Sequence, residues 1–398
     1  MKNVNLFITL ICLVSLSSTC QKEAAEDLVN IQVQIQVKMR IPTAYNLQPD
    51  QGLLYQGAYV VWANDQTGNR VLLAYDLETQ TKLWEMDCDG LLGWGQPMLL
   101  EGEYLIADRP EIGLSIINLV NQEVQVSYRY DSTPGFTSNT PPTVYNGKVY
   151  KGVYSPSNGL STVLSIDMED GTVHPEFQWL NDLEYNRQLS SPLLYEGEGG
   201  ALNLLMAMLL DNPDSDLSFD RKIFMINGNK DYSFNWIDTL IPAGARTVVH
   251  FLPVIIEDDL YVAYEDKMTS YDIRSGERNW VQEIEKNNLL KLISKAGELY
   301  LNTYNEFSKL DKATGEVMWT QTTKSAPTMS ADFSVHEDYL MYTSFDFWHL
   351  VLLNPNTGAC YKVDHSEVEQ ITTPVIYNSG ELFVTHTIED EVIGFVVE

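Results

Sequence analysis

The sequence predicts an all-β fold, an eight-bladed β-propeller of four-stranded antiparallel blades. First, a nine-residue pattern, with an Asp four positions before a Gly and eight before a Trp, stands at residues 272–280 and again at 311–319. Second, copies of this pattern recur along the 398-residue chain at a spacing of roughly forty residues, as in repeat architectures. Third, short apolar and aromatic runs bounded by turn residues precede the copies, and such runs are typical of strands.

The unit at residues 253–282 shows what one copy encodes. Its apolar or aromatic runs lie at 253–256, 260–264, 268–273 and 277–282, with polar turn residues between them. Four short strands with turns about every 8–12 residues are typical of one antiparallel sheet. Each unit is therefore predicted to be one blade.

The Asp, Gly and Trp of the pattern are predicted to build the blade rather than to carry chemistry. Gly276 can adopt a positive φ without steric cost, so the third strand can fold straight back on the fourth. The side chain of Asp272 can bond backbone amides of that same turn. Trp280 then lies on the last strand, where its large flat ring can fill the space between neighbouring sheets.

Looser copies of the pattern occur elsewhere in the chain. Residues 76–84 keep the Asp-to-Trp distance but have Gln80 in place of the glycine, and weaker versions lie at 167–179, 227–236 and 354–361. The pattern therefore marks blades throughout the chain.

The number of units predicts how the ring closes. Eight unit fronts begin near residues 54, 97, 142, 192, 253, 290, 333 and 374. The last unit stops after its third strand at Glu398, whereas residues 31–39 alternate apolar and polar residues as a half-buried strand does. We expect this N-terminal strand to complete the eighth blade, because closure removes free sheet edges. Residues 31–398 then form a single propeller domain, and a seven-bladed ring is the alternative.

The N-terminus is predicted to be an export signal. Residues 1–19 contain a short charged start, an apolar core too short to span a membrane, and small residues that lead to Cys20. This order resembles a bacterial lipoprotein signal, which implies lipid attachment at Cys20 and a membrane anchor. Residues 20–30 are then a flexible tether. The alternative is an ordinary signal peptide in which Cys20 has no role.

Charge and cysteine content narrow the possible partners. The chain has 55 Asp and Glu against 25 Lys and Arg, a formal net charge of -30, which repels nucleic-acid phosphates and excludes that class of partner. Cys88 and Cys360 lie in the first and seventh units, which a whole blade should separate, so we expect no disulfide between them. Core burial and ring closure are expected to hold the fold.

The repeat resembles that of the pyrroloquinoline-quinone dehydrogenase-like propellers, over essentially everything after residue 50. Size and the expected lipid anchor make the chain most similar to the lipoprotein scaffold family of the outer-membrane β-barrel assembly machinery. That resemblance implies a non-catalytic protein of the outer membrane, periplasmic or surface-exposed, with another envelope protein as its partner. The quinone enzymes place an adjacent cysteine pair against their cofactor, and this sequence contains no such pair. No cofactor is therefore predicted.

An acidic insertion in the fourth unit is the one conceivable metal site. Its carboxylates offer hard oxygens that suit calcium: Asp211, Asp214, Asp216 and Asp220. Their spacing does not match the EF-hand loop, which needs carboxylates at alternate positions and a glycine at the sixth. A solvated loop is the preferred interpretation, with calcium as the alternative. None of the six histidines stands in a zinc-binding spacing.

Aromatic residues in two irregular segments are candidate binding positions: Trp94, Phe345, Phe347 and Trp348. Exposed rings could stack on a sugar or a peptide, although filling gaps between blades is the preferred interpretation. The leading hypothesis is thus a non-catalytic scaffold that presents loops to an envelope protein. The alternatives are a cell-surface glycan-binding protein or carbohydrate-active enzyme with a site at the mouth of the propeller channel and, less favoured, a quinone-dependent dehydrogenase.

Overall fold

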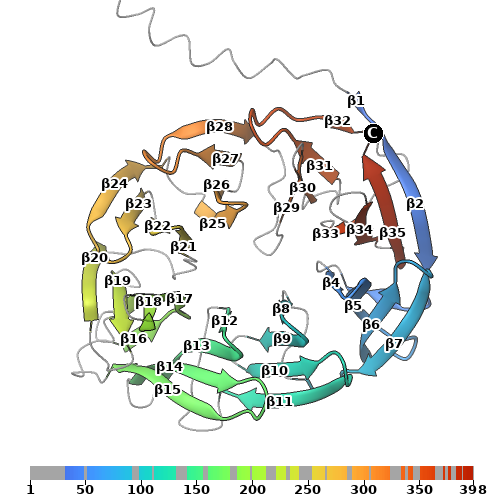
Figure 1. Cartoon of the computed structure of the whole chain (residues 1–398), viewed down its shortest axis with the longest axis horizontal. Coiled ribbons are helices and arrows are strands. Elements are labelled where there is room, and N and C mark those ends of the chain that lie inside the picture. The colour runs from blue at the N-terminus through green and yellow to red at the C-terminus, as the bar shows by residue number, and fades with distance from the viewer. Residues whose placement is uncertain are drawn as a thin grey trace, which may run out of the picture.

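The described residues of the computed structural model form a closed ring of eight blades, as the sequence predicts (Figure 1). The structure describes residues 32–48, 52–91, 98–109, 112–130, 141–155, 160–179, 186–197, 200–211, 221–229, 234–241, 253–264, 267–284, 289–303, 306–322, 333–336, 339–343, 350–363, 371–372, 375–377, 382–387 and 389–397.

The first four blades follow one another along the chain. Blade 1 contains β3 (Asn46–Leu47), β4 (Leu53–Tyr55), β5 (Ala58–Asn64), β6 (Arg70–Asp76) and β7 (Thr81–Asp87). Blade 2 contains β8 (Leu99–Glu101), β9 (Tyr104–Arg109), β10 (Gly113–Asn118) and β11 (Glu123–Arg129). Blade 3 contains β12 (Thr143–Tyr145), β13 (Lys148–Ser155), β14 (Leu160–Asp167) and β15 (Val173–Trp179). Blade 4 contains β16 (Asn186–Leu189), β17 (Leu193–Glu196), β18 (Leu202–Asp211), β19 (Arg221–Asn229) and β20 (Phe234–Ile241).

The last four blades bring the chain back to its start. Blade 5 contains β21 (Val254–Ile256), β22 (Asp259–Tyr264), β23 (Lys267–Asp272) and β24 (Arg278–Glu283). Blade 6 contains β25 (Leu289–Lys295), β26 (Glu298–Thr303), β27 (Glu306–Leu310) and β28 (Val317–Thr322). Blade 7 contains β29 (Ser334–Val335), β30 (Leu340–Thr343) and β31 (Leu350–Leu353). Blade 8 contains β33 (Val375–Tyr377), β34 (Leu382–His386), β35 (Glu391–Val397) and the N-terminal β2 (Ile35–Pro42).

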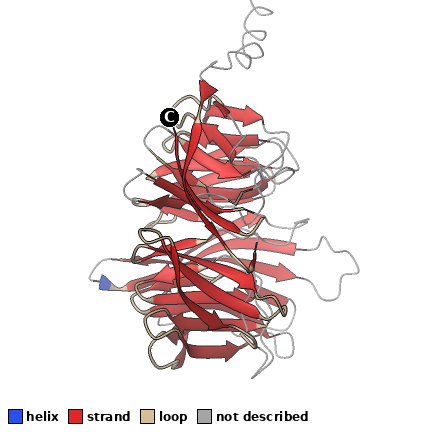
Figure 2. Ribbon diagram, turned by 90° about the vertical axis from the view of Figure 1, so that its right-hand side faces the viewer, coloured by secondary structure: helices blue, strands red, loops and turns tan. Residues whose placement is uncertain are grey.

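Each blade runs outward from the ring axis, with its short first strand nearest the centre (Figure 1). From the side, the strands run across the thickness of the ring between two faces (Figure 2). We call the face with the turns between first and second strands, and between third and fourth strands, the turn face. The opposite face, where the chain passes from one blade to the next, is the crossover face. Blades 1 and 4 each carry an extra strand before the usual four. In blade 1 this strand is β3, which pairs with β5, and in blade 4 it is β16, which pairs with β18.

The N-terminal segment closes the ring, as predicted, but as two strands rather than one. β1 (Gln32–Val33) pairs in parallel with β32 (Lys362–Val363), beside blade 7, and β2 pairs antiparallel with β35 in blade 8. A bulge between Val37 and Met39 reverses which side the apolar residues face. Residues up to Val37 therefore pack between blades 7 and 8, whereas Met39 and Ile41 pack between blades 8 and 1.

The repeat pattern joins each blade to the next. A bulge lies one residue before the Trp of β24, and it turns that ring toward blade 6. Trp280 Nε1 donates to the Lys312 carbonyl at 3.0 Å, and the indole covers Gly315. Trp236 and Trp319 make the same contacts to the following blades. The predicted packing role of these tryptophans is confirmed.

Two blades have a different residue at a position of the repeat pattern but keep its geometry or its contact. Gln80 holds the glycine position of blade 1 and adopts the left-handed backbone geometry, with a φ of 56°. In blade 3 the buried Phe177 packs against Gly228 of blade 4, where a tryptophan was expected to lie. The turn geometry and the interblade contact therefore survive changes of residue type.

Substitution of Gly315 by Ala is expected to cost about 2–5 kcal/mol of unfolding free energy. Its φ is +74°, which costs about 1–2 kcal/mol with a side chain, and the new Cβ would lie 2.6 Å from the Trp280 ring. Gly297 is the matched control, because its φ is +73° and a Cβ there meets nothing within 4 Å. Urea unfolding of both variants measures the difference, and equal losses would contradict the interblade contact.

Candidate functional site

The binding positions singled out in the sequence lie outside the described residues: Cys20, Trp94, Asp214, Asp216, Asp220, Phe345, Phe347 and Trp348. The backbone of Asp211 ends β18, so the acidic insertion does fall between the second and third strands of blade 4. The strands that flank residues 92–97, 212–220 and 344–349 all end on the crossover face. The described strand ends that border the three candidate segments thus share one face of the ring.

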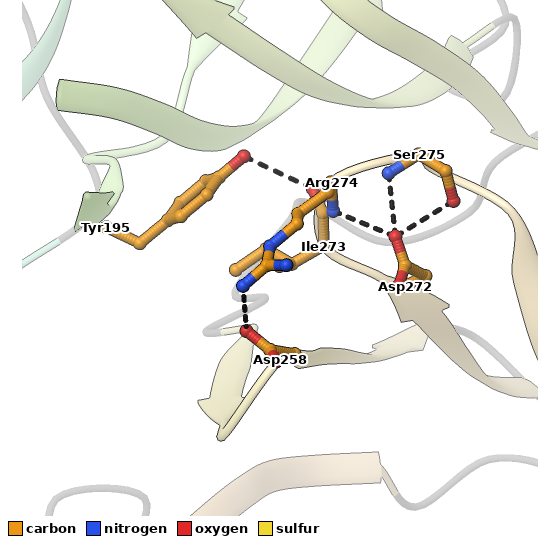
Figure 3. A network of polar contacts seen from close by, with 6 residues as sticks. All are labelled: Tyr195, Asp258, Asp272, Ile273, Arg274 and Ser275. Carbon is orange, nitrogen blue, oxygen red and sulfur yellow. Dashed lines mark hydrogen bonds and ion pairs between the residues drawn. The ribbon is translucent and has the colours of Figure 1, made fainter. Parts of the chain in front are cut away.

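The turn face is built from side chains that bond the backbone of their own turns. Asp272 accepts hydrogen bonds from the backbone amides of Arg274 at 3.1 Å and Ser275 at 2.7 Å (Figure 3). These bonds, chiefly that from Ser275, lower the pKa of the Asp272 carboxyl. Arg274 also pairs with Asp258 at 3.0 Å, and both side chains are mostly exposed. The predicted role of the repeat Asp is confirmed.

One backbone carbonyl in this turn accepts hydrogen bonds from three side chains of blade 4. The oxygen of Ile273 accepts from Tyr195 Oη at 3.2 Å, from Asn227 Nδ2 at 3.2 Å and from Trp236 Nε1 at 3.0 Å (Figure 3 shows the first). The polar atoms of the repeat are thus used within the frame, between adjacent blades.

A buried ion pair joins blades 2 and 3, close to the crossover face. Lys151 Nζ lies 2.7 Å from Asp108 Oδ2, and the Lys151 side chain is fully buried. Tyr130 donates its hydroxyl to the other carboxylate oxygen, and the ammonium lies 5.4 Å from the Tyr130 ring centre. Burial lowers the pKa of Lys151 despite the opposing attraction of Asp108, and burial raises the pKa of Tyr130.

This cluster has the composition of an acid–base site, but its side chains are buried among the described residues. The opposite charges of Lys151 and Asp108 compensate each other, and the ion pair links blade 3 to blade 2. Sequence reasoning missed it. The available signal was a charged residue inside an apolar strand, as at Lys151 in the run from Val149 to Tyr154.

A second buried titratable group lies where the ring closes. His386 ends β34 in blade 8 and contacts Tyr59 of blade 1. The described groups that contact it are polar and uncharged, and burial lowers the pKa of His386 to about 4. His386 was one of six histidines that sequence spacing could not distinguish.

Cys88 and Cys360 are free, as expected. Among the described residues, no group of three or more His, Cys, Asp or Glu side chains is arranged to hold a metal ion. Within the same part of the chain, no helix has the length and apolar character needed to cross a membrane.

Comparison with solved structures supports the fold. BamB from Moraxella catarrhalis superposes with a TM-score of 0.57 at 12% identity, covering 91% of this chain and 99% of that chain. The computationally designed Ika8 protein gives 0.57 at 11% identity over 89% and 97%. Sqt1 from Saccharomyces cerevisiae gives 0.57 at 10% identity over 92% and 98%. These likenesses concern architecture.

Sequence comparison is more specific. No curated protein matches the chain. The family model described as outer membrane protein assembly factor BamB matches residues 52–321 and 229–393, which together span nearly the whole ring. The chain therefore belongs to this BamB-type family of PQQ-like propellers.

Proposed function

We propose that the protein is a non-catalytic scaffold lipoprotein of the bacterial outer membrane that presents loops to another envelope protein. The family match over residues 52–321 and 229–393 carries this proposal, because the family is described as an outer membrane protein assembly factor. It covers the closed ring itself, so the likeness extends to the part of the chain that would meet a partner.

The contacts made by the repeat residues within the ring support this role. The Asp, Gly and Trp of the repeat serve the turns and the contacts between blades. Partner recognition is then left to the irregular segments, as is common for binding residues on a rigid scaffold. Trp94 and the aromatic residues at 345, 347 and 348 are the proposed contacts, and their flanking strands end on the crossover face.

The proposed anchor limits how far the ring can lie from the membrane. Eleven residues lie between Cys20 and Gln32, the first residue of β1, so the chain makes twelve residue-to-residue steps from one to the other. An extended chain of that length spans at most about 40 Å. Since β1 lies beside blade 7, a lipid at Cys20 would hold that side of the ring near the bilayer surface.

Affinity capture from native membranes tests the proposal. The lipidated protein, solubilised in mild detergent, is expected to recover a defined envelope protein. Combined substitution of Phe345, Phe347 and Trp348 by Ala should reduce this recovery at least tenfold. Phe234→Ala is the control, because Phe234 is an exposed aromatic at the start of β20, on the turn face. Cys20→Ser should release the protein from the membrane fraction.

If the protein instead binds glycans, the lipidated protein is expected to bind a glycan and to recover no envelope protein. Capture of a glycan on an array, with no protein recovered from membranes, would contradict the scaffold role. Equal loss of capture in the triple variant and in Phe234→Ala would contradict the assignment to the crossover face.

A further inference from the structure

A short strap carries the chain across the seam between blades 8 and 1. Residues 43–48 leave β2 in blade 8 and reach blade 1, where β3 pairs with β5. The strap is fastened to the turn after β34: Thr43 N donates to the Asp390 carbonyl at 2.9 Å, and Leu47 N donates to Asp390 Oδ1 at 2.8 Å. The far end of the strap, at Gln48, is held by a side chain.

That side chain is His386, which bonds through both ring nitrogens. Its Nε2 lies 2.6 Å from the Gln48 carbonyl oxygen, and its Nδ1 lies 2.8 Å from Tyr59 Oη. A carbonyl can only accept, so the proton must be on Nε2, and Nδ1 then accepts from the Tyr59 hydroxyl. Both bonds are satisfied by the neutral ring, which is 1% exposed.

Among the described residues, the groups in contact with His386 carry no negative charge that would balance an imidazolium. Tyr59 of β5 is the titratable side chain in contact with it, and Thr372 Oγ1 lies 3.3 Å from Nδ1. The nearby charged groups of this seam are engaged otherwise, since Asp390 bonds Leu47 N and Glu391 pairs with Arg40 at 2.7 Å. Glu389 is exposed on the turn between β34 and β35.

We propose that His386 is an acid-sensitive latch, whose protonation releases the strap at residues 43–48 and loosens the seam between blades 8 and 1 before the rest of the ring unfolds. A proton on Nδ1 would point at the Tyr59 hydroxyl, which now donates to that atom. The buried imidazolium would also meet no counter-charge among the described groups that contact His386, and an unpaired charge is costly inside a protein.

The direction of the pH effect follows from linkage. Burial lowers the pKa of His386 from 6.5 in a free side chain to about 4 in the folded protein. The stabilising effect of the neutral ring is therefore complete above pH 6.5 and is lost as the pH falls toward 4. Relative to pH 7, the equilibrium constant for a closed seam should fall about 20-fold at pH 5 and about 100-fold at pH 4.

Hydrogen exchange measured by mass spectrometry on the full-length protein tests the latch. After correction for the intrinsic effect of pH, peptides covering residues 43–48 and 382–391 should lose about 20-fold in protection between pH 7 and pH 5. Peptides from blade 5 serve as the internal reference and should change less than threefold.

Two substitutions of His386 each keep one of its two hydrogen bonds and remove the group that takes up the proton. His386→Asn retains an acceptor for Tyr59, and His386→Gln retains a donor for Gln48, so both are expected to be less protected at pH 7 but insensitive to pH. His174→Asn, at an exposed position on β15, should behave as the wild type. A pH response at the seam that persists in both His386 variants, or an equal loss of protection in blade 5, would overturn the proposal.

Discussion

Deletion of residues 32–42, which form β1 and β2, is expected to prevent formation of the closed ring. The deleted segment buries four apolar side chains between blades: Val33, Ile35, Met39 and Ile41. Burial of each contributes about 1.5–3 kcal/mol, so the sum is about 6–12 kcal/mol. This is comparable with the whole stability of a typical domain, about 5–15 kcal/mol. The truncated chain should therefore be largely unfolded or aggregated.

Circular dichroism, size-exclusion chromatography and limited proteolysis measure this outcome. Deletion of residues 22–31, which precede β1, is the control and should leave the unfolding midpoint unchanged. A peptide of residues 31–43 added to the truncated chain should restore part of the protease resistance. A truncated chain that unfolds at the same denaturant concentration as the intact protein would show that the ring does not depend on the N-terminal strands.

Substitution of Lys151 by Met is expected to lower the unfolding free energy by about 3–5 kcal/mol at pH 7. The change leaves the carboxylate of Asp108 buried without its counter-charge, which is the costly way to break a buried pair. Replacement of both partners, Asp108→Leu with Lys151→Met, should recover much of the loss, because an apolar pair needs no charge compensation.

Denaturant unfolding of the two single variants and the double variant completes a mutant cycle. Tyr130→Phe is a useful control, since it removes one donor to Asp108 and keeps the ion pair. Its cost should stay near 1–3 kcal/mol. Additive losses in the double variant, with no recovery, would contradict the interpretation of Asp108 and Lys151 as a coupled pair.

The sequence was informative where structure is decided by neighbours along the chain. The turn at Asp272 follows from residues within eight positions of one another, and so do the positive φ of Gly276 and the position of Trp280. A missing last strand and a spare alternating run were enough to predict closure. The split into β1 and β2 was not predicted, because the bulge between Val37 and Met39 serves two different blade interfaces.

Contacts between residues of different blades could not be predicted from the sequence. Lys151 meets Asp108 across 43 positions, and His386 meets Tyr59 across 327. Neither spacing resembles a motif, and the pairing depends on which residues face the next sheet. Phe177 likewise packs on Gly228 because the bulge in β15 places it there, although its residue type does not match the repeat.

Site-specific photocrosslinking in intact cells tests the central claim most directly. A photoreactive residue at position 348, in a segment between strands that end on the crossover face, should crosslink to one defined envelope protein. The same residue at position 257, on the exposed Glu257 of the turn face, should give no such product. Crosslinking to the same protein from 257 alone, or from neither position, would contradict a scaffold that binds its partner through crossover-face loops.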